Sequence, residues 1–485
     1  MNRSTRAKRS GGRGLSARAA GASLDPKDRA PRDGTVAVLA LVAFAVSRLA
    51  LVTVIGLPKW TADMVLYSSL AAETKGALAS GRTVHEAHAA AAGKRDASRA
   101  DVEYPPLAVA FIAAPGYLVW SDATPDGRLP ETAGAYRTAM RGLLFACDLA
   151  CFALLMLGQR RLARHSSARA RLLALLGYLL ATTLLWNIIY DRLDLAVGLL
   201  LLAAALCLST GPRWLAGLVL ATGTSFKLVP VLLVPLWLLS QPAFADRPWD
   251  GRACVRDAGR ALGWLAVFLV IINAPFLWYE GSAALRFVSY HRARGLQVES
   301  LVASLVAVAR PLGLDLTVQN SHGAWHMVST ASRVLAGAAG GLQMVVLLLF
   351  YGLYFRRARS VAPSPPTCAL SAAALITAAV ATATVLSPQY LFWILPLAFV
   401  LPTERHIGAA QLAILMASLL TAVLWPYLYT AELLGAVVDQ SRNLRAGPTA
   451  LGTVILLTRN ALLVTAAVFL VRADAPARND HRLPG

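Results

Sequence analysis

Charged side chains are scarce in this chain, and acidic ones are scarcer than basic ones. Only 15% of the 485 residues are Asp, Glu, Lys or Arg, whereas 57% are hydrophobic. Soluble domains carry about a quarter charged and about half apolar residues. So few polar side chains cannot cover one water-soluble core made from all the apolar segments. The composition therefore excludes a soluble globular protein and indicates an integral membrane protein.

Cysteine is also rare. The five cysteines are scattered, lack the spacing of metal ligands and mostly lie in or beside apolar segments; they are Cys147, Cys151, Cys207, Cys254 and Cys368. An odd, scattered set of this kind is no disulfide framework, so we expect free thiols in the core. The sequence also lacks an internal repeat, a soluble domain and a signal-peptide cleavage pattern after its first apolar segment.

Positive charge is in excess, with a net charge of +20. A nucleic-acid-binding protein would carry this charge on a folded basic face. Here it gathers in short connections between apolar segments and in residues 1–33, which hold nine Lys or Arg and three Asp. Lys and Arg mark the cytoplasmic ends of membrane spans. We therefore expect a disordered, basic cytosolic tail at 1–34, a cytosolic tail at 472–485 and no nucleic-acid partner.

Apolar segments recur from residue 35 to residue 471, and most are long enough to cross a hydrocarbon core of about 30 Å. They predict an all-α, polytopic membrane protein with about 12 transmembrane helices. The expected spans are 35–57, 139–157, 171–189, 193–209, 213–227, 228–240, 260–278, 331–355, 368–386, 389–402, 408–428 and 448–471.

The alternation of inner and outer connections fixes the role of one short apolar piece. Residues 104–120 contain three prolines, and counting them as a span would place the Arg cluster of 160–171 outside. The conflict disappears if this piece is a re-entrant or interfacial segment, because broken backbone is tolerated where protein or a cavity satisfies it. We therefore expect one outer loop at 58–138 and a second at 279–330, with both termini cytosolic.

Polar and ionisable residues gather on the outer side of this topology, where groups at membrane depth are costly and usually functional. The candidate site residues are Asp63, Glu103, Tyr104, Asp191, Arg192, Asp194, Lys227, His291, Arg292, Arg294, Glu299, Gln389 and Tyr390. A carboxylate in such a set can act as general base on an acceptor hydroxyl. Cations can hold a phosphate leaving group, such as that of a polyprenyl phosphate lying in the bilayer.

Each candidate also has a purely structural interpretation. Asp63 has the residue type of a helix N-cap. Asp191, Arg192 and Asp194 lie close enough in sequence to form an ion pair within one tight loop. Lys227 has a side chain long enough to reach the membrane interface from within a span. These alternatives stay open from the residues alone.

A metal site is not expected. His85 and His88 have a spacing that suits two metal ligands, but the sequence offers no third ligand beside them. The aromatic residues near the span ends are typical of the interfacial belt of membrane proteins. The sequence therefore predicts neither a metal nor another cofactor.

Several short motifs, taken in order, resemble the GT-C superfamily of membrane glycosyltransferases. More narrowly, the chain is similar to glycosyltransferase family 87, the polyprenol-phosphate-mannose-dependent α-mannosyltransferases. The resemblance covers most of residues 35–471 and rests on Asp63 with Tyr67, Glu103-Tyr104-Pro105-Pro106-Leu107, the stretch Asp194 to Pro230 with Ser225-Phe226-Lys227, His291 to Ser300, and Leu386-Ser387-Pro388-Gln389-Tyr390 before Trp393 and Pro396.

The resemblance implies a GT-C-like bundle and an inverting displacement at the anomeric carbon of the sugar, usually without a metal. It implies that Asp63 is the catalytic base. On this basis we expect Lys227, with Arg292 or Arg294, to hold the donor phosphate. Asp191, Arg192 and Asp194 are expected to shape the donor pocket. The remaining candidates, Glu103, Tyr104, His291, Glu299, Gln389 and Tyr390, are expected to bind substrate.

The chain departs from the family pattern at positions that are expected to touch substrate. Asp191-Arg192 replaces Gly-Gln, and Gln389 and Tyr390 stand where family members carry His. The expected activity is transfer of mannose, with arabinofuranose or another pentose as alternatives, from a polyprenyl-phosphate donor to an envelope glycolipid or glycan. A transporter or flippase, and a non-catalytic scaffold, are the alternative functions; transporters usually show internal repeats, which this sequence lacks.

Overall fold

The computed structural model describes residues 26–58, 61–92, 101–119, 133–245, 249–310, 313 and 316–474. The predicted tails therefore lie outside the described residues at 1–25 and 475–485. Residues 26–34, which the sequence analysis assigned to the first tail, form the start of helix α1 (Pro26–Ala50).

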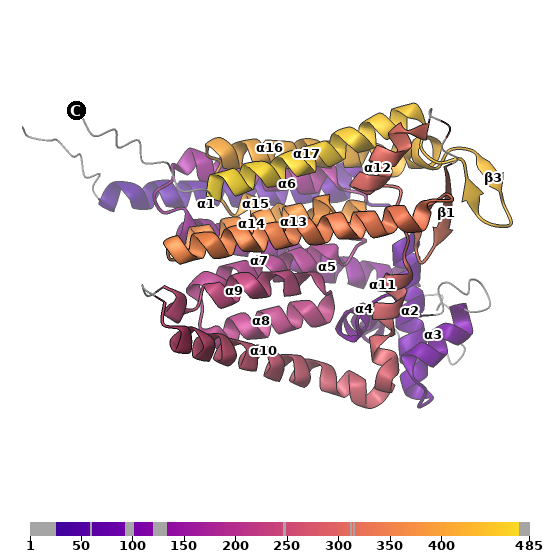
Figure 1. Cartoon of the computed structure of the whole chain (residues 1–485), viewed down its shortest axis with the longest axis horizontal. Coiled ribbons are helices and arrows are strands. Elements are labelled where there is room, and N and C mark those ends of the chain that lie inside the picture. Colours follow the sequence, from indigo (N-terminus) through magenta and orange to yellow (C-terminus); the bar gives the residue numbers. More distant parts are fainter. Residues whose placement is uncertain are drawn as a thin grey trace, which may run out of the picture.

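The fold is a bundle of long helices (Figure 1). Among the described residues, six helical segments are long and apolar enough to cross a membrane. They are α1 with η1 (Leu51–Ile55), α5 (Ala133–Leu162), α10 (Gly251–Glu280) running through η5 (Gly281–Leu285) into α11 (Arg286–Ala293), α13 (Ser332–Ser360), α16 (Arg405–Ala422) with η8 (Val423–Leu434), and α17 (Ala450–Asp474).

Shorter helices fill the bundle between these segments. They are α6 (Ala168–Leu184), α7 (Asp194–Thr210), α8 (Arg213–Phe226), η3 (Val229–Leu233), α9 (Val234–Leu239), η4 (Pro242–Phe244), α14 (Pro365–Ala381), η7 (Pro388–Tyr390) and α15 (Leu391–Phe399). All of α15 is buried, and α14 is buried from Cys368 onward. The small side chains of α14, mostly alanine, suit a central position because they let neighbouring helices approach closely.

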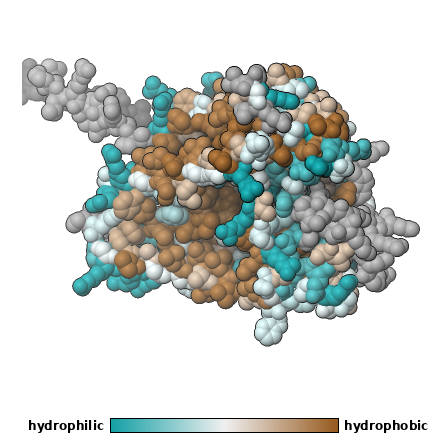
Figure 2. Space-filling view, turned by 45° about the vertical axis from the view of Figure 1, so that its right-hand side comes forward, coloured by the Kyte–Doolittle hydropathy of each residue, from teal (hydrophilic) through white to brown (hydrophobic). Residues whose placement is uncertain are grey.

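Each predicted span coincides with a helix, but the count of about 12 crossings stays a prediction. The nine residues of α15 rise only about 14 Å, less than half of a hydrocarbon core. The outer faces of the long helices are apolar, with exposed fractions of 93% for Trp278 and 74% for Val334 (Figure 2). A surface of this kind belongs in lipid, because water would not tolerate so large an apolar patch. The protein is therefore a membrane protein.

The predicted re-entrant segment forms helix α4 (Pro106–Val119). Its 14 residues rise about 21 Å, which is short of the hydrocarbon thickness. The hydroxyl of Tyr136 in α5 donates to the carbonyl of Ile112 over 2.8 Å and holds α4 to the bundle. This length suits an interfacial or re-entrant helix, and its position in the bilayer stays a prediction.

A small sheet lies at one end of the bundle and is the part of this largely helical fold that the all-α prediction did not include. Its strands are β1 (Thr317–Ser321), β2 (Ala324–Val328), β3 (Val437–Asp439) and β4 (Leu444–Arg445), in the antiparallel order β2-β1-β4-β3. The sheet joins the second predicted outer loop to the connection that precedes α17. Strands of two to five residues are too short for an alternation of apolar and polar residues to reveal them.

The same end carries α2 (Ala62–Ala79), α3 (Val84–Ala92), α11 and α12 (Leu301–Val308), whereas α1 begins and α17 ends at the opposite end (Figure 1). A second apolar cluster fixes this end. It packs Leu296, Val318 and Met327 of the sheet region against Leu433 of η8 and Leu456 of α17. The sheet is thereby held rigidly over the bundle.

Candidate active site

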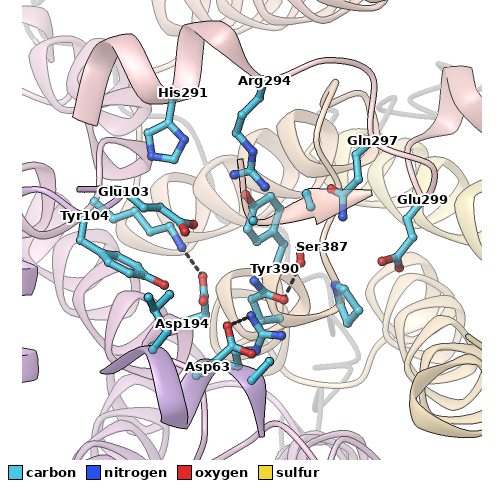
Figure 3. Close-up of a pocket in the computed structure, with 18 of the residues that line it drawn as sticks. Asp63, Glu103, Tyr104, Asp194, His291, Arg294, Gln297, Glu299, Ser387 and Tyr390 are labelled. Atoms are coloured by element: carbon cyan, nitrogen blue, oxygen red, sulfur yellow. Dashed lines mark hydrogen bonds and ion pairs between the residues drawn. The ribbon is translucent and has the colours of Figure 1, made fainter. Parts of the chain in front are cut away.

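A cavity of about 380 Å³ opens between the bundle and the sheet. On the bundle side, its walls come from the start of α2, the segment before α4, the start of α7, the end of α8, η7, α15 and η8 (Figure 3). On the other side they come from α11 and the β1–β2 hairpin. The charged side chains that line it are Asp63, Glu103, Arg192, Asp194, Lys227, Arg294 and Glu299. Segments far apart in sequence thus bring most of the chain's candidate site residues to one place.

Two of the predicted site residues do not line this cavity. Asp191 is buried and accepts hydrogen bonds from Arg141 over 2.7 and 2.9 Å. Arg141 also donates to the carbonyl of Pro58, so this pair ties α5 to the end of the first span. Arg292 is exposed on α11. The other candidates, from Asp63 to Tyr390, line the cavity.

Asp63 lies in the first turn of α2 and faces the cavity. It is not the N-cap, because Thr61 holds that position and accepts from the backbone N–H of Met64. Its carboxylate instead accepts a hydrogen bond from Arg192. Burial raises the pKa of Asp63 above its ordinary value, and the positive charge of Arg192 opposes this shift. The chain therefore holds a carboxylate of raised pKa at the cavity wall.

Asp194 and Lys227 form a second ion pair beside the first. The Lys227 ammonium donates to Asp194 Oδ1 over 2.7 Å, and the indole N–H of Trp393 donates to the same oxygen over 2.7 Å. Lys227 Nζ lies 4.9 Å from the ring centroid of Trp393 and 5.4 Å from that of Tyr390, and these two rings stack at 3.9 Å. The Asp194 carboxylate and the faces of the two rings all attract the Lys227 ammonium. Lys227 therefore lines the cavity and does not extend to the membrane interface.

The prediction of a local ion pair in the loop before α7 is wrong. Asp191, Arg192 and Asp194 pair with Arg141, Asp63 and Lys227, which come from three other elements. Asp191, Arg192 and Asp194 therefore contact three different elements, and only the pairs of Arg192 and Asp194 line the cavity.

Arg294 stands apart from the other cations of the cavity. Within the described part of the chain it forms no salt bridge, and its buried Nε has no hydrogen-bond partner. It faces the cavity near His291, opposite the ion pairs (Figure 3). A guanidinium with an unpaired charge and a buried donor is suited to bind an anionic ligand.

One edge of the cavity is apolar and reaches the outside of the bundle. Leu228, Val229 and Phe287 line the cavity there. Leu228 is 44% exposed, and Val231 one turn further along η3 is 45% exposed. Figure 2 shows the apolar face of the bundle hollowed beside a group of hydrophilic side chains. The cavity thus borders the lipid-facing surface next to Lys227.

Sequence reasoning missed several residues of the site. Gln297, Asn320, Trp325, Trp425 and Tyr429 line the cavity from the sheet and from η8. The tryptophans were taken as part of an interfacial aromatic belt. Gln297 lies inside the motif from His291 to Ser300 but was given no role, and Asn320 belongs to no motif. Only the fold brings the hairpin over the bundle, so no local signal identifies these side chains.

Arg459 was missed as well because it lies inside a predicted span. It donates to the Glu299 carboxylate over 2.8 Å and to the Glu299 carbonyl over 2.6 Å. Burial raises the pKa of Glu299, which is 1% exposed, and the charge of Arg459 opposes this shift. The pair fastens the loop after α11 to α17.

His85 and His88 lie outside the cavity and pair with carboxylates. His85 Nδ1 is 3.0 Å from Glu280, and His88 Nδ1 is 2.6 Å from Glu73. Across the described residues, no group of three or more His, Cys, Asp or Glu side chains is arranged to hold a metal ion. The two pairs join α3 to α10 and to α2.

The family model for glycosyltransferase family 87 matches residues 102–368. The chain belongs to glycosyltransferase family 87. The matched range includes Glu103, Arg192, Asp194, Lys227 and Arg294 and ends before η7, while α2 precedes it. No curated protein matches the chain. This family 87 protein is a membrane glycosyltransferase, and its cavity is the candidate active site.

Proposed function

We propose that this family 87 protein transfers a sugar from a polyprenyl-phosphate donor to a hydroxyl of a cell-envelope glycolipid or glycan. The donor sugar is mannose, with arabinofuranose or another pentose as the alternative. A single observation carries the proposal: one cavity holds a carboxylate, several cations and an apolar edge that meets the lipid-facing surface. Donor phosphate, donor lipid and acceptor proton each find a matching group there.

The donor phosphate fits between Lys227 and Arg294. Lys227 and Arg192 are each balanced by an aspartate, whereas Arg294 has no acidic partner among the described residues. A bound phosphate supplies the missing anion, and charge-assisted hydrogen bonds from Lys and Arg hold it. The polyprenyl chain leaves over Leu228, the exposed apolar residue that follows Lys227. Arg292, exposed and outside the cavity, has no role in this proposal.

The reaction is a direct displacement with inversion. The acceptor oxygen forms a bond to the anomeric carbon, and the bond from that carbon to the phosphate oxygen breaks. The phosphate leaves with the electron pair, and Lys227 and Arg294 offset its growing charge. Asp63 accepts the proton of the acceptor hydroxyl as general base. The first turn of α2 and Arg192 orient its carboxylate.

The donor hypothesis is tested with purified protein, radiolabelled polyprenyl-phosphate-mannose and a crude envelope-lipid acceptor mixture. Asp63→Asn protein and a polyprenyl-phosphate-arabinofuranose donor run in parallel. We expect labelled product from the wild type with one donor and none from the variant. Product from neither donor would contradict the proposed donor class, and equal product from the Asp63 variant would contradict the base.

The active site faces the outer side of the plasma membrane in this proposal, with both termini cytosolic. Helices α2 and α11 and the β1–β2 hairpin, which line the cavity, lie at the end opposite the start of α1 and the end of α17 (Figure 1). The last turn of α13 carries Arg357 and Arg359, and that of α17 carries Arg472, as cytosolic helix ends do. A cavity gathered at one end favours a transferase over a transporter, whose substrate site lies near the bilayer midplane.

Orientation is tested by labelling a cysteine introduced at Ser441, an exposed residue next to β3. We expect a membrane-impermeant maleimide to label intact cells that carry Ser441→Cys. The cysteine-free parent, in which the five native cysteines are replaced, is the control. Labelling only after the cells are lysed would place the site on the cytosolic side.

A further inference from the structure

The cavity has a second end under the β-hairpin, where most of the lining side chains are uncharged. Its residues are Gln297, Asn320, Trp325, Trp425 and Tyr429, which together are named here the hairpin subsite. In Figure 3 Gln297 lies at one side of Asp63 and Tyr390, whereas Glu103, Tyr104 and His291 lie at the other. The hairpin subsite is therefore separate from the lipid-bordered end beside Lys227.

The backbone fixes the side chains of the hairpin subsite. Asn320 and Trp325 are opposite each other in the β1–β2 register, and the Val298 N–H donates to the Trp325 carbonyl over 2.9 Å. Arg445 of β4 lies 5.6 Å from the centroid of the Trp325 ring and supports it. On the η8 side, the Trp425 and Tyr429 rings meet edge to face at 4.6 Å. The aromatic surfaces are thus positioned before any ligand binds.

The unpaired side-chain oxygen of Gln297 is the observation that indicates a ligand. It is 3% exposed and lines the cavity, and within the described structure its buried Oε1 has no hydrogen-bond partner. A buried acceptor without a donor costs about 1–3 kcal/mol, so buried groups of this kind are rare in folded proteins. The site thus holds an acceptor that a donor from a ligand would satisfy.

We infer that the hairpin subsite binds the acceptor substrate as a neutral carbohydrate, with a sugar hydroxyl donating to Gln297 Oε1 and a sugar ring packed against Trp325 or Trp425. The inference rests on the proposed function and narrows its acceptor to a glycan. Sugars combine apolar ring faces with many hydroxyl donors, and a pocket of aromatic rings and a few fixed polar groups matches both.

The charges near the subsite favour a neutral ligand. None of the five side chains of the hairpin subsite is ionised, and the nearby Glu299 is neutralised by Arg459. Among the cations that line the cavity, Arg192 is paired with Asp63 and Lys227 with Asp194, so an anionic acceptor would be drawn to Arg294, at the donor-phosphate end. That end is occupied by the donor phosphate in the proposed reaction.

The test measures binding without catalysis. Purified full-length protein is titrated with neutral trisaccharides of mannose, glucose, galactose or arabinose. Isothermal titration calorimetry measures the binding, and the variants below assign it to the subsite. We expect saturable binding of at least one trisaccharide. Gln297→Leu and Trp325→Ala should each weaken it about fivefold or more, the equivalent of one lost hydrogen bond or ring contact. Trp278→Ala, at a tryptophan that is 93% exposed on α10, is the matched control and should bind like wild type.

A second measurement separates a ligand role from a structural one. Gln297→Leu removes an unsatisfied buried acceptor, so its unfolding temperature should equal or exceed that of the wild type while sugar binding falls. Trp325→Phe should keep part of the binding that Trp325→Ala loses. These results would support the subsite even if Trp325→Ala folds poorly.

The outcomes distinguish this inference from the proposed function. No saturable binding of any trisaccharide, or binding that Gln297→Leu and Trp325→Ala both leave unchanged, overturns the hairpin subsite, whatever the transferase assay shows. Binding with the expected variant effects supports the subsite, and if no sugar is transferred from a polyprenyl-phosphate donor, the proposed donor is wrong instead.

Discussion

Two arginine–aspartate pairs in this protein have the same chemistry and different surroundings. Arg48 and Asp148 join α1 to α5 inside the bundle, 2.6 Å apart, with 4% and 0% of their side chains exposed. Arg192 and Asp63 join the loop before α7 to α2 at the cavity wall, with 17% and 14% exposed. One pair is sealed in the bundle, and the other opens onto the cavity of the candidate active site.

The sealed pair has no bonding capacity left for a substrate. Asp148 also accepts from Tyr178 over 3.3 Å and from Tyr190 over 2.8 Å, and Arg48 also donates to Thr182 over 2.9 Å. A satisfied network of this kind holds three helices together. The comparison teaches that an ion pair at membrane depth indicates function only where it borders a cavity. The predictions below test the division between the two pairs.

Removing the cavity carboxylate should have the largest effect. We expect Asp63→Asn to lower kcat by about 10²–10⁴-fold, the range of a positioned general base, because an amide cannot accept the acceptor's proton. The measurement is transfer from polyprenyl-phosphate-mannose at saturating donor.

The control for this prediction is Asp439→Asn, at a partly exposed aspartate on β3 outside the cavity, which should keep wild-type activity. The thermal unfolding of Asp63→Asn should stay close to that of the wild type. Near-normal turnover by a folded Asp63→Asn protein would show that another group takes the proton.

Breaking the sealed pair should reduce stability instead of chemistry. We expect Asp148→Asn to lower the free energy of unfolding by about 3–5 kcal/mol, because Arg48 is then left buried without its counter-charge. The double variant Arg48→Met with Asp148→Leu should recover most of this loss, because it removes both charges together. Unfolding in detergent monitors both. A single variant as stable as the wild type would show that the network is dispensable.

The positions of the helices followed from the sequence because the lipid-facing segments are long and apolar. Spans such as 331–355 correspond to α13 within a few residues. The count of crossings did not follow, because α15 and α9 are apolar but too short to be classed by length. The sheet did not follow either, since β4 has two residues and pairs with a segment more than a hundred residues away.

The cavity could be predicted only where charge marked it. Asp63, Lys227 and Arg294 are conspicuous because an ionised group next to an apolar segment is costly. Their ion-pair partners were not predictable. The sequence from Asp191 to Asp194 suggests an ion pair within one loop, but helix packing places each of these side chains beside a partner from another element. Gln297 is uncharged, so although it lies inside the motif from His291 to Ser300, only the structure indicates a role for it.

Removing the cation of the second cavity pair should weaken donor binding. We expect Lys227→Gln to raise the KM for the polyprenyl-phosphate donor about tenfold or more, because a charged hydrogen bond contributes about 1.5–3 kcal/mol. The KM for the acceptor should change little. Lys75→Gln is the matched control, because Lys75 lies over the Tyr117 ring, away from the cavity. A fall in kcat with an unchanged donor KM would place Lys227 away from the ground-state phosphate.

The smallest effect should be a shift in the pH profile. In the proposed reaction the ionised form of Asp63 is the base, so activity should be lost as pH falls through its pKa. Burial raises that pKa above its ordinary value of about 3.9, with Glu103 and Asp194 acting in the same direction, whereas the charge of Arg192 lowers it. Arg192→Gln removes this opposing positive charge. The acid limb of kcat/KM should therefore move to higher pH, and Arg192→Lys, which keeps the charge, should leave the limb closer to that of the wild type. The contrary result is an acid limb that moves to lower pH in Arg192→Gln, or that moves equally in both variants. It would show that Arg192 does not set the ionisation of Asp63, and that the Arg192–Asp63 pair is as structural as the Arg48–Asp148 pair.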